Sequence, residues 1–378
     1  MNRRLRGLAL IAVAIVVVAI GAWRYMNPRA FGPKRTDGAI AALVRPTPGP
    51  LADYRALFAL DMRHLWEGEA KGDGGYLYRS DDGGATWHGA EIPFQALEVK
   101  FFDPTHGVAT GASFGAGIYE TSDGGVTWSP INLLAGTVSQ ASEWVSPSDG
   151  WAQSARGGLW ATNDGGRSWR SLAATPGQTD FFDLVFRDPL HGVVQPLLIT
   201  HLQNGVSAEE CAQPTLYYTD DGGATWRSPK VPPTFKSSSG FFIQWLGDGT
   251  GAVTSLGGTC TPGQPSTQTL MSVTYDGGMT WSPTLATSSG LMDMVSATEW
   301  WVTAGNALER TFDGGSSFLP VAQPRVALTL MGFKAFPGGG VLALFGKLTG
   351  PGTISAPSTM ATSTDYGGHW TVRSLPAA

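Results

Sequence analysis

The sequence predicts an all-β fold, a seven-bladed β-propeller with four-stranded antiparallel blades, preceded by one N-terminal transmembrane helix. A short motif of the pattern S/T-x-D-x-G-x-T-W recurs seven times, and its copies are spaced by about one four-stranded blade. One apolar run stands near the N-terminus. Glycine and proline, 51 and 25 of 378 residues, fit short strands joined by tight turns, because glycine adopts the positive φ that hairpins need.

The spacing of the seven motif aspartates sets the blade register. Successive aspartates are separated by 41, 41, 57, 55, 37 and 52 residues, which corresponds to one blade per copy. A second pattern, two apolar strands around a turn, precedes each copy and is clearest at 97–111 and 181–194. In the first blade this pattern falls at 56–70 and the motif strand at 75–87, so the count closes at seven.

Each motif copy has the composition of a hairpin turn closed by its own side chains. The Asp carboxylate can accept backbone N–H bonds, the Gly supplies positive φ, and the aromatic residue is expected to pack between strands of its blade. One reaction would not need seven copies, so these residues are interpreted as structural and no catalytic residue is assigned. They are Asp82, Asp123, Asp164, Asp221, Asp276, Asp313, Asp365, Trp87, Trp128, Trp169, Trp226, Trp281, Phe318 and Trp370.

Residues 1–26 have the features of an export signal that stays attached as a membrane anchor. An uninterrupted apolar run at 8–23 follows a basic segment that keeps the N-terminus in the cytoplasm. Cleavage after Ala22 would place Ile20 where a small residue is preferred, so an anchor is favoured over a cleaved, secreted form. We therefore expect a single-pass protein of a bacterial cell membrane, with a Pro/Gly linker at 27–50 and the propeller at 51–378 outside the cytoplasm.

The charge of the chain disfavours nucleic acid as a partner. Seven of the 25 basic residues lie in the first 35 positions, which contain no acidic residue. The remainder carries 18 basic and 30 acidic side chains, a formal charge of −12. Such a surface repels phosphate backbones and anionic lipids.

The motif copies resemble BNR or Asp-box repeats, and we call them Asp boxes below. Together with the F-x-D-x-x-x-G-x-A-x-G turn at 101–111, their spacing is similar to that of the photosystem II stability/assembly factor family. The resemblance covers about residues 51–378 and implies a non-enzymatic propeller that assists assembly of a membrane complex. Sialidases, xyloglucanases and sortilin-type receptors share the repeat, so the box predicts a fold more directly than a function.

Three connections between second and third strands are predicted to be much longer than the others, at 195–214, 256–269 and 347–357. They lie on the face opposite the Asp boxes, which we call the long-loop face. A protein partner is expected to bind there, with a glycan as the other option and tolerated length variation as the alternative. Two of these loops carry Cys211 and Cys260, in adjacent blades. We expect a disulfide rather than two free thiols, and no metal or cofactor.

Three acidic residues are assigned one register near the start of the inner strands of blades two, four and six, by alignment on the turn glycines: Glu98, Asp183 and Asp293. Two interpretations stay open. The carboxylates could form an acidic ring at the channel mouth that attracts a cation or a basic peptide, or they could pair locally, for example with Lys100 or Arg187.

His106 and His191 each occur in a D-P-x-H-G sequence and are interpreted as turn residues. The preferred function is a monomeric, non-catalytic scaffold or assembly factor. The alternatives are a sialidase-type glycoside hydrolase and a carbohydrate or peptide receptor without turnover. Resemblance to sialidases implies three clustered arginines, but Arg63, Arg187 and Arg325 stand at unlike registers, which disfavours the enzyme.

Overall fold

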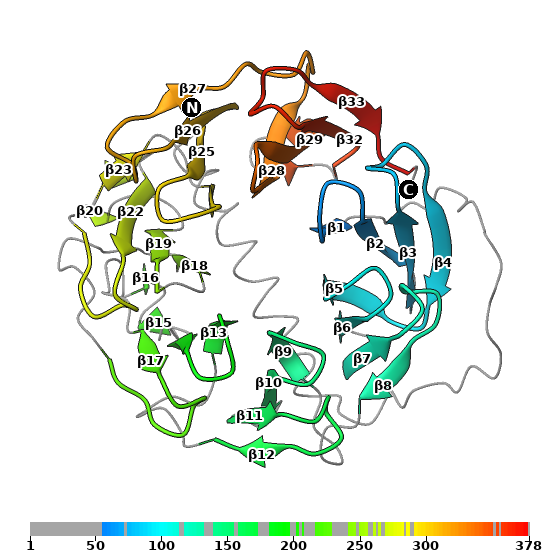
Figure 1. The fold of residues 1–378 in the computed structure, drawn as a ribbon, viewed down its shortest axis with the longest axis vertical. Helices are drawn as coiled ribbons and strands as arrows, with labels where there is room; N and C mark the ends of the chain where they lie inside the picture. The colour runs from blue at the N-terminus through cyan, green and yellow to red at the C-terminus, as the bar shows by residue number, and fades with distance from the viewer. Residues whose placement is uncertain are drawn as a thin grey trace.

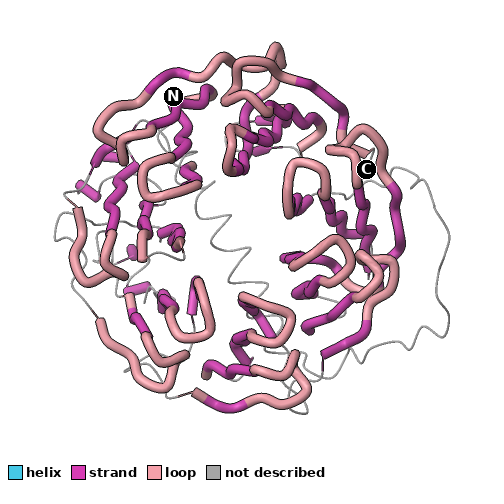
Figure 2. The backbone as a smooth tube through the Cα atoms, viewed as in Figure 1, coloured by secondary structure: helices cyan, strands magenta, loops and turns pink. Residues whose placement is uncertain are grey.

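Seven β-sheets stand around a central axis, each with its first strand nearest the axis (Figure 1). This computed structural model describes residues 55–376 except 72–73, 113–116, 132–138, 155–157, 173–180, 197–201, 204–205, 208–215, 229–240, 247–248, 256–259, 262–263, 266–268, 283–284, 288–290, 351–352 and 355–356. The described chain consists of strands joined by loops and turns (Figure 2). The predicted seven-bladed all-β fold is confirmed.

The first three blades each have four antiparallel strands that follow one another from the axis outward. Blade 1 contains β1 (Arg55–Ala59), β2 (Leu65–Lys71), β3 (Gly74–Ser80) and β4 (His88–Ile92). Blade 2 contains β5 (Gln95–Phe101), β6 (Gly107–Ala112), β7 (Gly117–Thr121) and β8 (Ser129–Ile131). Blade 3 contains β9 (Ser139–Trp144), β10 (Gly150–Ser154), β11 (Leu159–Thr162) and β12 (Arg170–Ser171).

The last four blades continue the same order around the ring. Blade 4 contains β13 (Phe181–Phe186), β14 (Gly192–Pro196) and β17 (Tyr217–Thr219). Blade 5 contains β18 (Phe241–Trp245), β19 (Gly251–Ser255), β22 (Thr269–Thr274) and β23 (Leu285–Thr287). Blade 6 contains β24 (Met292–Met294), β25 (Trp300–Ala304), β26 (Ala307–Thr311) and β27 (Leu319–Pro320). Blade 7 contains β28 (Thr329–Phe336), β29 (Gly340–Gly346), β32 (Thr359–Ser363) and β33 (Thr371–Ser374).

Blade 4 differs from the predicted four strands. Among the described residues its sheet has three strands, and the fourth position holds a single antiparallel bridge between Tyr218 and Arg227. Pro229 follows two residues later in the sequence and has no N–H with which to extend a ladder. In the described part of blade 4, the outer edge consists of this bridge.

The three connections predicted to be longest each contain a two-stranded hairpin. These hairpins are β15 (Leu202–Gln203) with β16 (Val206–Ser207), β20 (Cys260–Thr261) with β21 (Gln264–Pro265), and β30 (Leu348–Gly350) with β31 (Thr353–Ile354). Each lies between the second and third strands of its blade, in blades 4, 5 and 7. Because the strands of a blade alternate in direction, all three hairpins lie on the face opposite the Asp boxes.

Apolar side chains fill the junctions between neighbouring blades. At the junction of blades 1 and 2, the ring of Trp66 stacks on that of Phe101 with centroids 3.7 Å apart, and Trp128 packs against the same cluster. The box aromatics of the other blades likewise pack against the preceding blade. They also contact the first strand of their own blade, as Trp128 does with Phe101, Trp169 with Trp144 and Trp226 with Phe186. The box aromatics therefore lie between their own sheet and the preceding one.

Each Asp box is closed by side-chain hydrogen bonds, as the sequence predicted. In blade 1 the amide of Thr86 donates to Oδ1 of Asp82 at 2.8 Å, and its hydroxyl donates to Oδ2 at 2.7 Å. Oγ of Ser80 donates to the same carboxylate at 2.9 Å and accepts from the amide of Gly84 at 2.8 Å. Gly84 has φ of 82°, a conformation that glycine adopts without strain.

These hydrogen bonds make the fold sensitive to acid. Bonds from the hydroxyls of Ser168, Thr280 and Ser317 hold the pKa of Asp164, Asp276 and Asp313 at about 2. A carboxylate whose pKa is lowered on folding stabilises the folded state above its unfolded pKa of about 4, and this contribution is lost as the pH falls through the folded value.

We therefore expect the melting temperature to fall as the pH is lowered from about 4 to about 2, in calorimetric scans at constant ionic strength. Asp276→Asn, which cannot titrate, should start from a lower melting temperature and lose less of it over this interval. Equal slopes for the two proteins would contradict this role of the box carboxylates.

Two predicted features lie outside the described residues. Residues 1–50, with the predicted anchor and linker, are not described, and within the described part no helix is long and apolar enough to cross a membrane. Cys211 is not described either, so the disulfide with Cys260 stays a prediction.

Candidate functional site

The three acidic residues assigned to the channel do not share one register. Glu98 and Asp183 lie three residues before the last residues of β5 and β13. Asp293 lies one residue before the end of β24, level with Lys100 of blade 2. The predicted alignment is therefore wrong for Asp293. Its blade has Trp300 where blades 2 and 4 have glycine, so the alignment on glycine had no anchor there.

Asp293 is a buried link between three blades. It is 4% exposed. Its Oδ1 accepts from Nζ of Lys334 at 2.9 Å and from Nε2 of Gln244 at 3.2 Å, and its Oδ2 accepts from the amide of Ala335 at 2.7 Å. These partners come from blades 5 and 7. Asp293 thus matches the interpretation as a locally paired carboxylate, although with partners that the sequence did not indicate.

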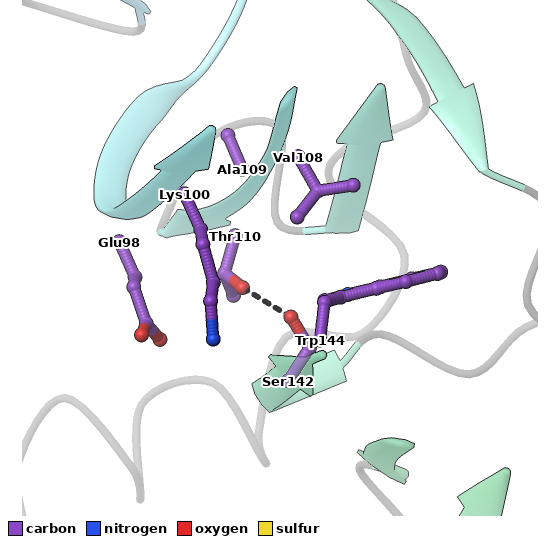
Figure 3. Close-up of a pocket in the computed structure, with 7 residues that line it drawn as sticks. All are labelled: Glu98, Lys100, Val108, Ala109, Thr110, Ser142 and Trp144. Atoms are coloured by element: carbon purple, nitrogen blue, oxygen red, sulfur yellow. Dashed lines mark hydrogen bonds between the residues drawn. The ribbon is translucent and has the colours of Figure 1, made fainter. Parts of the chain in front are cut away.

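Blades 2 and 3 are joined by two polar contacts near the axis. Nζ of Lys100 lies 2.7 Å from Oε1 of Glu143, and the hydroxyls of Thr110 and Ser142 are 2.7 Å apart. In Figure 3, Glu98 and Lys100 extend toward the same side of β5. The space that these residues border has a volume of about 10 Å³, which is enough for one water molecule. Lys100 thus pairs with Glu143, and Glu98 is an exposed residue that borders the same space as Lys100.

The arginines that a sialidase-type site would need lie far apart in the fold. Arg63 stands in the turn between β1 and β2, and Arg187 stands in the turn between β13 and β14, both on the box face. Arg325 is exposed in the connection from β27 to β28, on the opposite face. Arg187 forms an ion pair with Asp188, Nε to Oδ2 at 3.3 Å.

His106 and His191 are turn residues, as predicted. Nδ1 of His106 lies 2.8 Å from Oδ2 of Asp103, and Nδ1 of His191 lies 2.9 Å from Asp188. The same aspartates accept hydrogen bonds from backbone amides of their turns. Each histidine therefore has a complete structural explanation within its own turn.

The sequence did not indicate a larger cavity between blades 4 and 5, on the box face. Its volume is about 150 Å³. It is lined by Arg187, His191, Gly192, Tyr218, Thr219, Asp220, Arg227, Trp245, Asp276 and Gly277. These residues come from the turn between β13 and β14, from strands β14, β17 and β18, and from the Asp boxes of blades 4 and 5, so no contiguous motif indicates the cavity.

The fold and the repeats define the class of protein. The family model described as BNR/Asp-box repeat matches residues 78–88 and 217–228, which are the boxes of blades 1 and 4. The chain is thus a seven-bladed β-propeller that carries BNR/Asp-box repeats. No curated protein matches the chain.

Several solved structures share this fold. YCF48 bound to D1 peptide is 18% identical, with a TM-score of 0.54 over 79% of this chain and 92% of that one. YCF48 from Cyanidioschyzon merolae is 16% identical, with a TM-score of 0.52 over 79% and 94%. Virginiamycin B lyase from Staphylococcus aureus is 10% identical, with a TM-score of 0.50 over 78% and 92%. At these identities the likeness shows the fold alone.

Proposed function

We propose that the chain is a non-catalytic, monomeric scaffold that binds a protein partner through its long-loop face and assists assembly or stability of a membrane complex. The observation that carries this proposal is the gathering of three hairpins on one face of a rigid ring, in blades 4, 5 and 7. Loops held by a rigid framework are common binding elements. The similar fold of YCF48, solved with a bound D1 peptide, supports a use of this kind.

The proposal places the propeller outside the cytoplasm, held by an anchor at 1–26. The apolar run at 8–23 supports this placement. We expect the protein in the membrane fraction of its host, with the propeller open to protease added outside the cytoplasmic membrane. Recovery in the cytosol would contradict it.

Binding of the protein partner should depend on the hairpins. Replacing residues 348–354 by a short Gly-Ser link removes β30 and β31 but leaves β29 and β32 paired. After cross-linking and affinity purification from membranes, we expect a protein recovered with the full chain to be at least tenfold depleted with this variant. Met279→Ser on the box face is the matched control, because Met279 is 56% exposed there. Equal recovery after removal of all three hairpins would contradict the proposed face.

We further propose that the chain has no sialidase activity. Arg63 and Arg187 on one face and Arg325 on the other are not arranged to hold one carboxylate. Hydrolysis of a fluorogenic sialoside is expected to proceed at the rate of buffer alone. Turnover by the full chain that disappears in Asp183→Asn would overturn this proposal.

A further inference from the structure

We propose that the cavity between blades 4 and 5 on the box face binds a small apolar carboxylate. This site lies on the opposite face from the hairpins, and it is independent of the partner proposed above. Four features support it: a small residue where other junctions have tryptophan, buried donors without partners among the described residues, an arginine whose Nη1 is one of these donors, and an aromatic wall.

The junction of blades 4 and 5 lacks a large side chain that fills the junction of blades 1 and 2 and that of blades 3 and 4. Trp66 and Trp151 stack on Phe101 and Phe186, and their Nε1 atoms donate to the first box glycine of a following blade, Trp66 to the carbonyl of Gly124 at 2.9 Å. The register places Val193 at the corresponding position of β14.

The cavity is bordered by Asp276 and Gly277 from the box of blade 5. Its volume of about 150 Å³ is that of cavities known to hold a molecule the size of benzene.

Three side chains bring hydrogen-bond donors to the cavity, and none has a partner among the described residues. They are Nη1 of Arg187, the hydroxyl of Tyr218 and Nε1 of Trp245. Tyr218 is only 2% exposed, and its ring centroid lies 5.6 Å from that of Trp245. The Arg187 guanidinium carbon lies 5.9 Å from the Trp245 ring. Buried donors without acceptors are rare and destabilising, so a ligand with acceptor oxygens fits them.

Among the described residues at the cavity, Arg187 is the cation that can receive an anion. Arg227 lies 3.2 Å from a carboxylate oxygen of Asp220. The Asp276 carboxylate is occupied by Thr274 and Thr280 of its own box. Asp188 contacts Nε of Arg187 and also accepts from the amides of Leu190 and His191. A carboxylate matches the planar guanidinium better than a spherical anion does.

Part of the cavity wall is aromatic. Tyr218 and Trp245 both line it, with ring centroids 5.6 Å apart. Aromatic walls beside an arginine favour a ligand with a short hydrocarbon part. Burial raises the pKa of the Tyr218 hydroxyl, so this group stays protonated and able to donate.

Butyrate, with acetate for comparison, is the probe that tests the site. In protein labelled with ¹⁵N-tryptophan, the indole N–H signal of Trp245, assigned with Trp245→Phe, should shift saturably with butyrate and not with chloride at equal ionic strength. Butyrate should bind more tightly than acetate. Arg187→Gln should weaken binding at least about tenfold, the effect of losing a charge-assisted donor, whereas Arg167→Gln, an exposed arginine in the box of blade 3, should leave it unchanged.

Tyr218→Phe provides a readout that does not depend on the arginine. Without carboxylate this variant should melt at the same temperature as the unmodified chain or higher, because it removes a buried hydroxyl without a partner. Butyrate should raise the melting temperature of the unmodified chain and that of Tyr218→Phe much less. A Trp245 signal that does not move, as for a cavity holding water only, or one that moves equally in Arg187→Gln, would overturn the proposal.

Discussion

Replacing Trp66 by alanine is expected to lower the free energy of unfolding by about 3–5 kcal/mol. The side chain is fully buried, its ring stacks on Phe101 of the next blade, and its Nε1 donates to the carbonyl of Gly124 at 2.9 Å. Truncation would leave a cavity at a blade junction and an unpaired carbonyl in the next Asp box. Guanidinium denaturation followed by circular dichroism measures the loss.

Phe312→Ala is the control for the loss of an aromatic ring. Phe312 is 45% exposed on the box face, so its truncation should change stability by less than about 1 kcal/mol. Trp66→Phe should fall between the two, because it keeps a ring against Phe101 but loses the donor to Gly124. If Trp66→Ala and Phe312→Ala behaved alike, the junctions would not be the main source of stability.

Replacing Asp293 by alanine is expected to lower the free energy of unfolding by about 2–4 kcal/mol, somewhat less than the full effect of breaking a buried ion pair. The loss arises because the buried amide of Ala335 would have no acceptor and Gln244 would lose a bond that joins its blade to Asp293. The charge of Lys334 adds less, since that side chain is 51% exposed and can turn into solvent.

Asp81→Ala is the matched control for a lost carboxylate. Asp81 pairs with Arg79 at 2.8 Å, but its side chain is 49% exposed, so the loss should be below about 1 kcal/mol. Asp293→Asn should retain part of the stability, since its amide oxygen can still accept from Ala335. Chemical denaturation of the three variants in parallel tests this order, and a neutral Asp293→Ala would rule out the proposed link.

The fold could be predicted from the sequence because the same local structure occurs seven times. Asp82, Ser80 and Gly84 form bonds within one short turn, so neighbouring residues in the sequence contain all the information about it. Box 7 shows how tolerant that turn is: Tyr366 stands where the other boxes have their first glycine and still adopts φ of 62°.

Such local patterns could not predict the contacts between blades. The sequence did not indicate that the box aromatics also contact the preceding blade, because it shows which residues alternate but not which neighbouring sheet covers them. The register of Asp293 was mistaken because its blade replaces the turn glycine with Trp300. The cavity near Arg187 depends on Val193 being small and on Trp245 of the next blade, residues that only the assembled ring brings together.

The closure of the ring determines how freely the order of the blades along the sequence can change. The strands of each blade come from one continuous segment of the chain, and blades 7 and 1 meet through apolar side chains such as Leu65 and Met360 rather than through a shared sheet. A circularly permuted chain, joined across that seam and opened instead between β27 and β28, would keep every hydrogen-bonded ladder intact. The chain of this propeller could therefore begin at another junction between blades. The fold depends instead on the packing of each sheet against the next.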